Sequence, residues 1–140
     1  MSDPIRLVIL GVPMTKKTSQ QIATRRDGSP FIVSAQHHKK WAEVAAHQLR
    51  AQWGNRPPIE GMVHVRALIY RVRATGDLVG FKQAIGDVLE APGPRAKPAT
   101  QRRKASVIKN DVQIDSWDGT RRLKDKDNPR VEIEIREMTA

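Results

Sequence analysis

Alternating apolar and polar residues predict strands near both ends of the chain and in its middle. Residues 5–10 form a short run of mostly branched apolar side chains, and residues 31–33 form a shorter one. From residue 62 to 70 every second side chain is apolar, which places them on one face of a strand: Val63, Val65, Ala67 and Ile69. Residues 131–135 repeat this alternation with charged side chains between, which predicts a half-buried final strand. Residues 107–108 and 112–114 are typical of two further strand pieces.

Apolar residues that recur about every four positions predict two amphipathic helices. The first runs from about residue 35 to 53, with Ser34 as N-cap and a stripe at Trp41, Ala45, Leu49 and Trp53. That stripe suits either a core or an interface. The second runs from about 78 to 90, with its buried side at Phe81, Ile85, Val88 and Leu89. Strands before and after two helices predict an α+β fold, a small mixed sheet packed with two main helices, in a single domain over residues 1–140.

The charge balance narrows the class of partner. The chain has 140 residues, with 25 Lys and Arg against 15 Asp and Glu, a formal net charge of +10. Such an excess favours a polyanion, above all nucleic acid, although a merely solvated surface is the alternative. The absence of cysteine excludes disulfides and thiolate chemistry. No apolar run is long enough for a membrane span and no secretory profile opens the chain, so we expect no membrane and a cytoplasmic location.

Most of the excess charge falls in two predicted loops, over about residues 12–30 and 91–105. The second contains Pro, Gly and five cations without an acid, which predicts a flexible loop. Loops of this kind suit phosphate contacts, which contribute affinity without reading sequence. We expect the DNA-binding residues to be Lys16, Lys17, Arg25, Arg26, Arg102, Arg103 and Lys104. Aromatic residues are only 4% of the chain, so base stacking is not the dominant mode. Trp117 is a candidate for insertion as a wedge at the centre of a DNA branch. The alternatives are that it packs in the core or forms a dimer contact.

Three aspartates in this basic chain are candidates for metal binding. Asp77 lies between the middle strand and the second helix, Asp87 lies on that helix, and Asp111 follows the second basic loop. Phosphodiester hydrolysis with Mg²⁺ needs carboxylate oxygens that hold the cation. The alternative for Asp77 is a helix N-cap or a first-turn acid favoured by the helix dipole.

Four segments together resemble a known family. They are residues 11–17 (GVPMTKK), 77–89 (DLVGFKQAIGDVL), 107–114 (VIKNDVQI) and 128–135 (NPRVEIEI). In order and content they are similar to the RusA family of Holliday-junction resolvases, often carried by phages and prophages. The resemblance spans nearly the whole chain, and the third and fourth segments carry it most specifically.

This resemblance implies an endonuclease that depends on Mg²⁺, or Mn²⁺, and acts on four-way DNA junctions in recombination and repair. It implies branched DNA as partner and a homodimer. Asp77 matches the first aspartate of the family motif and Asp111 the last, while Lys82 lies beside the position of the family lysine. The expected catalytic residues are therefore Asp77, Asp111 and Lys82, and the expected metal ligands Asp77, Asp111 and Asp87.

The chain departs from the family motif at four positions. Val79 occupies the position of the second aspartate, Gly80 that of an asparagine, Gln83 that of the lysine, and Asn110 that of the first aspartate in a pair. On an extended segment residues i and i+2 point the same way, so the missing carboxylate at 79 should weaken Mg²⁺ binding. Three hypotheses stay open: an active nuclease, a family member that binds branched DNA without cutting it, and an unrelated basic nucleic-acid-binding domain.

Overall fold

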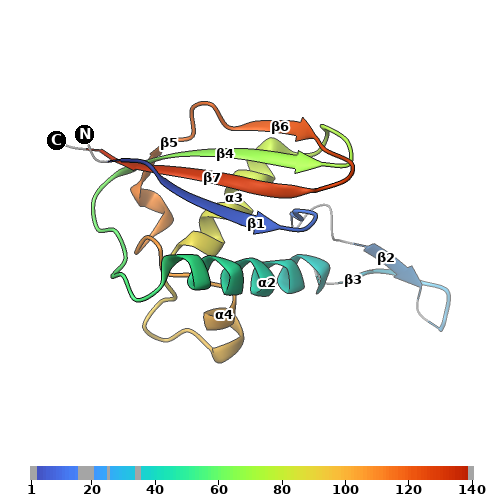
Figure 1. The fold of residues 1–140 in the computed structure, drawn as a ribbon. Coiled ribbons are helices and arrows are strands. Elements are labelled where there is room, and N and C mark those ends of the chain that lie inside the picture. The colour runs from blue at the N-terminus through green and yellow to red at the C-terminus, as the bar shows by residue number, and fades with distance from the viewer. Residues whose placement is uncertain (1–2, 16–20, 25, 34–35, 139–140) are drawn as a thin grey trace.

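The computed structural model describes residues 3–15, 21–24, 26–33 and 36–138, which form an α+β fold (Figure 1). The main sheet of this described part has five strands. β7 (Arg130–Glu137) lies between β1 (Ile5–Leu10) and β4 (Val63–Arg71) and is antiparallel to both. β5 (Ile114–Ser116) and β6 (Arg121–Lys124) pair in parallel with the other edge of β4. The predicted mixed sheet is confirmed, whereas β6 has no counterpart among the predicted strands.

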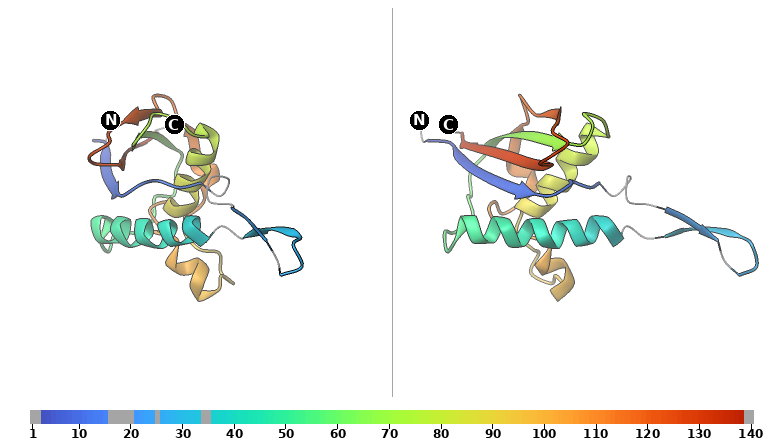
Figure 2. Two further views of the ribbon diagram at one scale, coloured as in Figure 1. Left: turned by 90° about the vertical axis from the view of Figure 1, so that its right-hand side faces the viewer. Right: turned by 45° about the vertical axis from the view of Figure 1, so that its right-hand side comes forward.

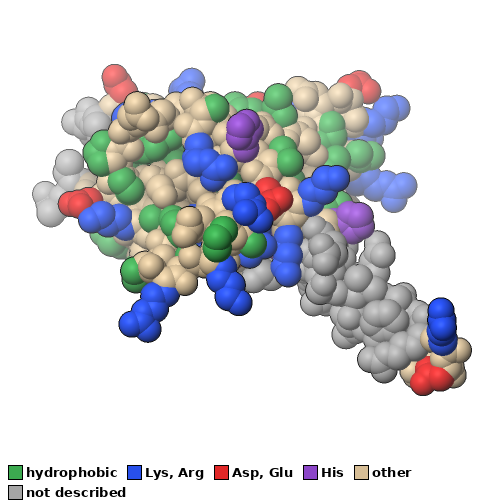
Figure 3. All heavy atoms as spheres, turned by 90° about the horizontal axis from the view of Figure 1, so that it is seen from below, with side chains coloured by type: hydrophobic (Ala, Val, Ile, Leu, Met, Phe, Trp, Pro, Cys, Tyr) green, Lys and Arg blue, Asp and Glu red, His purple; other side chains and the backbone are tan. Residues whose placement is uncertain are grey.

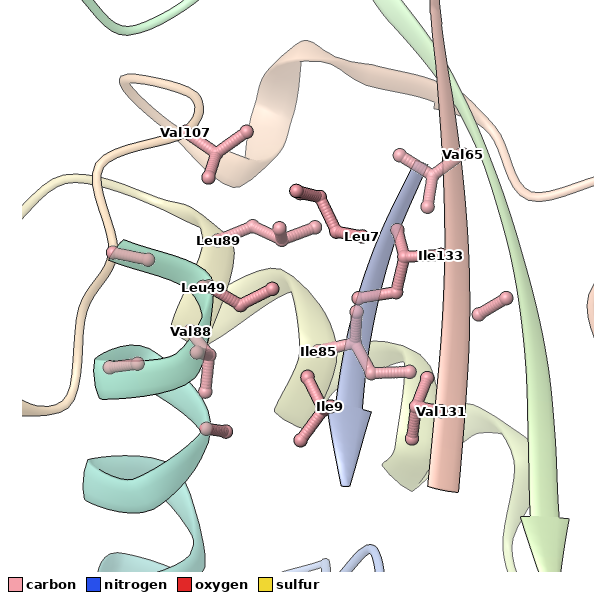
Figure 4. Packing of buried hydrophobic residues seen from close by; sticks show 14 of the residues in the cluster. Leu7, Ile9, Leu49, Val65, Ile85, Val88, Leu89, Val107, Val131 and Ile133 are labelled. Atoms are coloured by element: carbon pink, nitrogen blue, oxygen red, sulfur yellow. The ribbon is translucent and has the colours of Figure 1, made fainter. Parts of the chain in front are cut away.

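The helices α2 (Gln36–Trp53) and α3 (Leu78–Leu89) lie on one side of this sheet (Figures 1 and 2). The alternating apolar residues of the strands face them, because Val65 pairs with Ile135 and Ile69 with Val131 on the same face of the sheet. Figure 4 shows the resulting core, with Leu49 of α2 and residues of α3 pointing toward side chains of the strands. The two predicted helices are confirmed, and the whole stripe of α2 is buried in this core: Trp41, Ala45, Leu49 and Trp53.

A two-stranded hairpin of β2 (Gln21–Thr24) and β3 (Pro30–Val33) extends away from the sheet and helices (Figures 1 and 2). Its turn is closed by Asp27, whose Oδ1 accepts hydrogen bonds from the Ser29 amide at 2.9 Å and hydroxyl at 2.6 Å. Gly28 takes a φ of +89°, which favours glycine. The segment predicted as a long basic loop is therefore partly a hairpin.

The second predicted loop contains a short helix, α4 (Pro98–Arg102), and its end is tied to α3. The amide of Ala105 donates to Val88 O at 2.7 Å and that of Val107 to Leu89 O at 2.9 Å. Residues 91–97 and 103–105 are irregular, as in a loop, but α4 interrupts them, and these backbone bonds and the buried Ala105 hold the end of the segment against the core. The predicted flexibility of this segment stays a prediction.

The strand predictions for 107–108 and 112–114 are largely wrong. Ile108 forms only isolated bridges, and Asp111–Gln113 is a 3₁₀ turn, η1, that precedes β5. The buried side chain of Gln113 explains the turn: its oxygen accepts from the amides of Lys109 and Asn110, both at 2.8 Å, and its nitrogen donates to Ile59 O at 2.7 Å. A side chain that replaces ladder partners in this way competes with strand pairing. In the described part of the chain no helix has the length and apolar character needed to cross a membrane.

Candidate nucleic-acid interface

A hollow of about 260 Å³ lies along α3, and we call it the α3 hollow. One wall comes from the helix and the other from η1 and the segment that follows it. The lining residues are Val79, Lys82, Gln83 and Gly86 of α3, with Asp111, Ile114 and Trp117 opposite. Two residues of the predicted catalytic set, Lys82 and Asp111, thus lie at one site. No ion pair joins these two side chains, although both border the hollow.

Gly86 borders this hollow. A Cβ atom at this position would lie 3.6 Å from Asp111 Cβ and 3.9 Å from Trp117 Cζ2, which is ordinary van der Waals contact. The helix backbone therefore forms the floor of the hollow. Trp117 is half-buried and packs against the hydrophobic core from its edge. The ring thus packs partly against the core and also borders the hollow, while its roles as a wedge or in a dimer contact stay predictions.

Asp77 lies elsewhere. It occupies the N-cap position of α3, where its side chain makes no capping hydrogen bond. Its carboxylate lies over the first turn of the helix: a Cβ atom added to Gly80 would be 3.0 Å from Asp77 Oδ2 and 3.2 Å from the methyl carbon of Thr15. Gly80 and Gly86, the helix positions next to Asp77 and Asp111, are separated by about 9 Å along the axis at 1.5 Å per residue. They also point in different directions around the helix. Asp77 is therefore not among the residues that line the α3 hollow with Asp111.

Asp87 lines a different, larger hollow of about 390 Å³ between α2, α3 and α4. Its neighbours there include the buried His38 and the cations Lys39, Arg103 and Lys104. On a helix, residues 83 and 87 lie one above the other, so the ridge that they form separates this hollow from the α3 hollow. The structure thus distributes the three predicted metal ligands over three places.

A magnesium ion held by these three aspartates does not fit this arrangement. The α3 hollow offers one carboxylate, together with an ammonium group, a primary amide and a valine. Mg²⁺ requires oxygen ligands in a near-octahedral arrangement and is repelled by a neighbouring ammonium. All fifteen acids and four histidines belong to the described residues, and among these no group of three could hold a metal ion. The expectation of Mg²⁺ or Mn²⁺ stays a prediction for experiment.

The predicted DNA-binding residues divide into three groups. Lys16, Lys17 and Arg25 lie outside the described residues. Arg26 is exposed at the turn of the β2–β3 hairpin. Arg102 and Arg103 lie at the end of α4, and Arg102 keeps 61% of its side-chain surface exposed although it pairs with Glu43 at 3.2 Å.

Lys104 has a structural role instead. Its Nζ lies 2.7 Å from Glu90 Oε1 and donates to Asp87 O at 2.9 Å, with only 15% of the side chain exposed. Its charge is therefore neutralised within the fold, and its selection as a phosphate contact is not supported by this geometry. The basic run of residues 102–104 therefore contains an exposed cation, Arg102, next to a largely buried and paired one, Lys104. The sequence does not distinguish them, and the packing of the fold does.

Further cations extend the surface around α4, and two of them, Lys39 and Lys40, lie at exposed positions of α2 outside its buried stripe. We define the basic face as the solvent-accessible cations of α2 and of the loop around α4, apart from Arg50, which donates to the carbonyls of Arg102 and Lys104: Lys39, Lys40, Arg95, Lys97, Arg102 and Arg103. Figure 3 shows this side of the molecule, with Lys and Arg spread across it and few acids between them. Within the described ranges, Lys39, Lys40, Arg95 and Lys97 form no ion pair. The sequence does not predict Lys39 and Lys40 as DNA-binding residues. Their position in the helical pattern shows only that they lie on the polar side of a helix, and not what that side binds.

Comparison of the sequence with protein-family models and with curated proteins finds no match in either. The function is therefore inferred from the fold, the surface charges and the side chains that line the α3 hollow.

Proposed function

We propose that this protein binds branched DNA as a RusA-like protein and that it does so without cutting the DNA. The observation that carries the proposal is the basic face, most of whose exposed cations lack counter-ions from the described part of the chain. Cations without a partner attract phosphates and release the counter-ions condensed on DNA, which is the main source of affinity in such complexes. The net charge of +10 adds a long-range attraction in the same sense.

The α3 hollow supports binding rather than hydrolysis. Val79 is 61% exposed where a second carboxylate would be needed, and Lys82 occupies the same hollow as the remaining carboxylate of Asp111. A site with one carboxylate has little to hold a divalent cation against an adjacent ammonium. The alternative hypothesis is an active nuclease, and a cleavage assay distinguishes the two.

A homodimer is part of the same proposal. Four-way junctions have approximate two-fold symmetry, and a C₂ pair of chains would offer two equivalent basic faces to two pairs of arms. Sedimentation velocity of the protein alone and with a junction measures this directly. A protein that is monomeric both alone and on the junction would contradict the proposed homodimer.

The test compares a synthetic four-way junction with a linear duplex of the same length and composition. Affinity is measured by fluorescence anisotropy over a range of salt concentrations, and cleavage in parallel on denaturing gels with Mg²⁺ or Mn²⁺. We expect tighter binding to the junction, no product strands, and a log–log salt slope of about −0.9 for each phosphate neutralised. Paired nicks at the junction would overturn the proposal in favour of the nuclease. Equal affinity for both DNAs would favour a general nucleic-acid-binding domain.

A pair of matched variants tests the position of the interface. The double variant Lys39→Gln and Lys40→Gln removes two charges from the basic face. Lys124→Gln and Lys126→Gln remove two from exposed positions at the end of β6 and just after it; this strand lies away from α2 and α4 (Figure 1). We expect the first to lower junction affinity and to reduce the salt slope by about two. Equal losses in the two double variants would mean that only net charge matters.

A further inference from the structure

We infer that the α3 hollow binds a single unpaired nucleobase, with the adjoining phosphate at Lys82. The inference rests on the proposed function, because it names the part of branched DNA that the protein would recognise. It starts from the mixture of groups around the hollow. Apolar surface from Val79, Ile114 and Trp117 alternates there with three polar side chains, those of Lys82, Gln83 and Asp111.

The three polar side chains are available to a ligand. In the described part of the chain, the Lys82 ammonium, the Gln83 amide and the Asp111 carboxylate have no hydrogen-bond or ion-pair partner. Asp111 uses only its backbone, since its amide donates to Glu90 Oε2 at 3.1 Å. Lys82 and Asp111 border one hollow and form no ion pair with each other. A ligand with both an anionic group and hydrogen-bond donors could therefore bind to the two side chains at once.

A nucleobase with its phosphate has the matching chemistry. The indole of Trp117 and the methyl groups of Val79 suit the flat, apolar face of a base, because every base presents a π-surface that stacks on aromatic side chains. Val79 is 61% exposed, so its burial against a base would also remove apolar surface from water. Lys82, a flexible cation at the rim, suits the phosphate.

The polar groups further predict which bases are preferred. A carboxylate accepts hydrogen bonds from exocyclic amino groups, as on cytosine, and a primary amide such as that of Gln83 can both donate and accept at the edge of adenine. Thymine has no exocyclic amino group, and its one ring donor, N3–H, lies between two carbonyl oxygens that the Asp111 carboxylate repels. We therefore expect cytosine or adenine to be bound more tightly than thymine.

The place of the hollow suits DNA whose helix is interrupted. It lies across the ridge of Gln83 and Asp87 from the hollow that Lys39 and Arg103 line, so it is next to the basic face. A duplex on the basic face would keep its bases stacked and out of reach. At a branch or bulge an unstacked base can be extruded at low cost and reach α3.

The experiment uses duplexes that differ by one extrahelical nucleotide: none, cytosine or thymine. Binding is followed by anisotropy and by tryptophan fluorescence. Trp41 and Trp53 are 8% and 5% exposed, so a change in fluorescence on binding reports mainly Trp117. We expect the cytosine bulge to bind about tenfold more tightly than the plain duplex, which corresponds to about 1.4 kcal/mol, within the range of one base stacked on one aromatic ring. We also expect fluorescence to change only with a bulge.

Variants then assign the effect to the hollow. Asp111→Asn, which replaces a charged acceptor by a neutral amide, should reduce the preference for cytosine over thymine, and Gln83→Ala, at an exposed position, should weaken bulge binding alone. Trp117→Ala should abolish the bulge preference, and the two surface variants keep the test valid if this one unfolds. Lys97→Gln on the basic face is the control and should weaken binding to all three duplexes equally.

Failure of this inference and failure of the proposed function give different results. Equal binding to all three duplexes with unchanged fluorescence would overturn the nucleobase site and leave DNA binding intact. No binding to any DNA would overturn the proposed function and with it this inference. An unchanged cytosine preference in Asp111→Asn would overturn the assignment of the base edge to Asp111.

Discussion

Asp111 is tied to Glu90 by a hydrogen bond from its backbone amide to Glu90 Oε2, at 3.1 Å. The other carboxylate oxygen of Glu90 lies 2.7 Å from Lys104 Nζ. One side chain at the end of α3 thus connects the residue that borders the α3 hollow with the end of the loop that carries α4. This carboxylate adds a side-chain contact to the backbone hydrogen bonds that hold the α4 loop against α3.

Replacement of Glu90 should therefore destabilise the fold and loosen the α4 loop. Only 19% of the Glu90 side chain and 15% of Lys104 are exposed, so Glu90→Ala leaves a largely buried ammonium without its counter-ion. We expect the free energy of unfolding to fall by about 1–3 kcal/mol, measured by urea denaturation. Glu60→Ala is the matched control: its pair with Lys109 is 73% and 57% exposed, and little change is expected. Equal effects in both would show that the Glu90 contact is no more than a surface ion pair.

A second carboxylate in the α3 hollow should create a metal site. Val79 and Asp111 border the same hollow, so Val79→Asp places two carboxylates there. We expect the affinity for Mn²⁺ to rise by about tenfold, or about 1.4 kcal/mol, in isothermal titration calorimetry. Val79→Asn, which adds polarity without charge, should not show this gain, and Asp111→Asn should cancel it. Wild-type protein that binds Mn²⁺ as tightly as Val79→Asp would contradict the single-carboxylate interpretation of this site.

Two glycines near α3 should respond to alanine in opposite ways. Gly86 is helical and its added Cβ would make contacts of 3.6–3.9 Å, so Gly86→Ala should stabilise the protein by about 1 kcal/mol. Gly76 has a φ of +110°, and its added Cβ would lie 2.8 Å from Phe81 Cε2 in the core. Gly76→Ala should therefore destabilise it by about 1–3 kcal/mol. Thermal unfolding of both variants beside the wild type checks the two signs, and a destabilised Gly86→Ala would contradict the space found at that position.

Stability should fall in acid partly through Glu134 on β7. The side-chain hydrogen bond from Arg136 holds the pKa of the Glu134 carboxyl below its ordinary value of 4.5, and the positive charge of Arg66 acts in the same direction. A carboxyl whose pKa is lowered by folding contributes stability above the ordinary pKa, and this stability is lost as pH falls through the folded pKa. Urea denaturation from pH 7 downward should show a loss beginning near pH 4.5 that is smaller in Glu134→Gln. Glu137→Gln, at the exposed end of the same strand, is the control and should keep the wild-type loss.

The periodicity of the sequence predicted most of the secondary structure. Strands β1, β4 and β7 and helices α2 and α3 were all predicted from apolar spacing, because each must bury one face or stripe in a shared core. The strands predicted around η1 failed because the buried amide of Gln113 satisfies the backbone there, and no local pattern shows where a glutamine will be buried. The short β6 carries Arg121 and Arg122, and its pairing with β4 is a contact between distant segments that hydrophobic alternation does not reveal.

By itself, then, the sequence determined the α+β class, the residues of the core, and the excess of positive charge that favours an anionic partner. It also identified Asp111 and Lys82 as residues of interest. Only the tertiary structure decided which charges are available. It paired Lys104 with Glu90 and left Lys39 and Lys97 without ion pairs within the described residues, and it placed Asp77, Asp87 and Asp111 at three separate positions around α3. The physical reason is that periodicity reports which side of an element is buried, whereas a site depends on distances between side chains of different elements, and these are set when the elements pack.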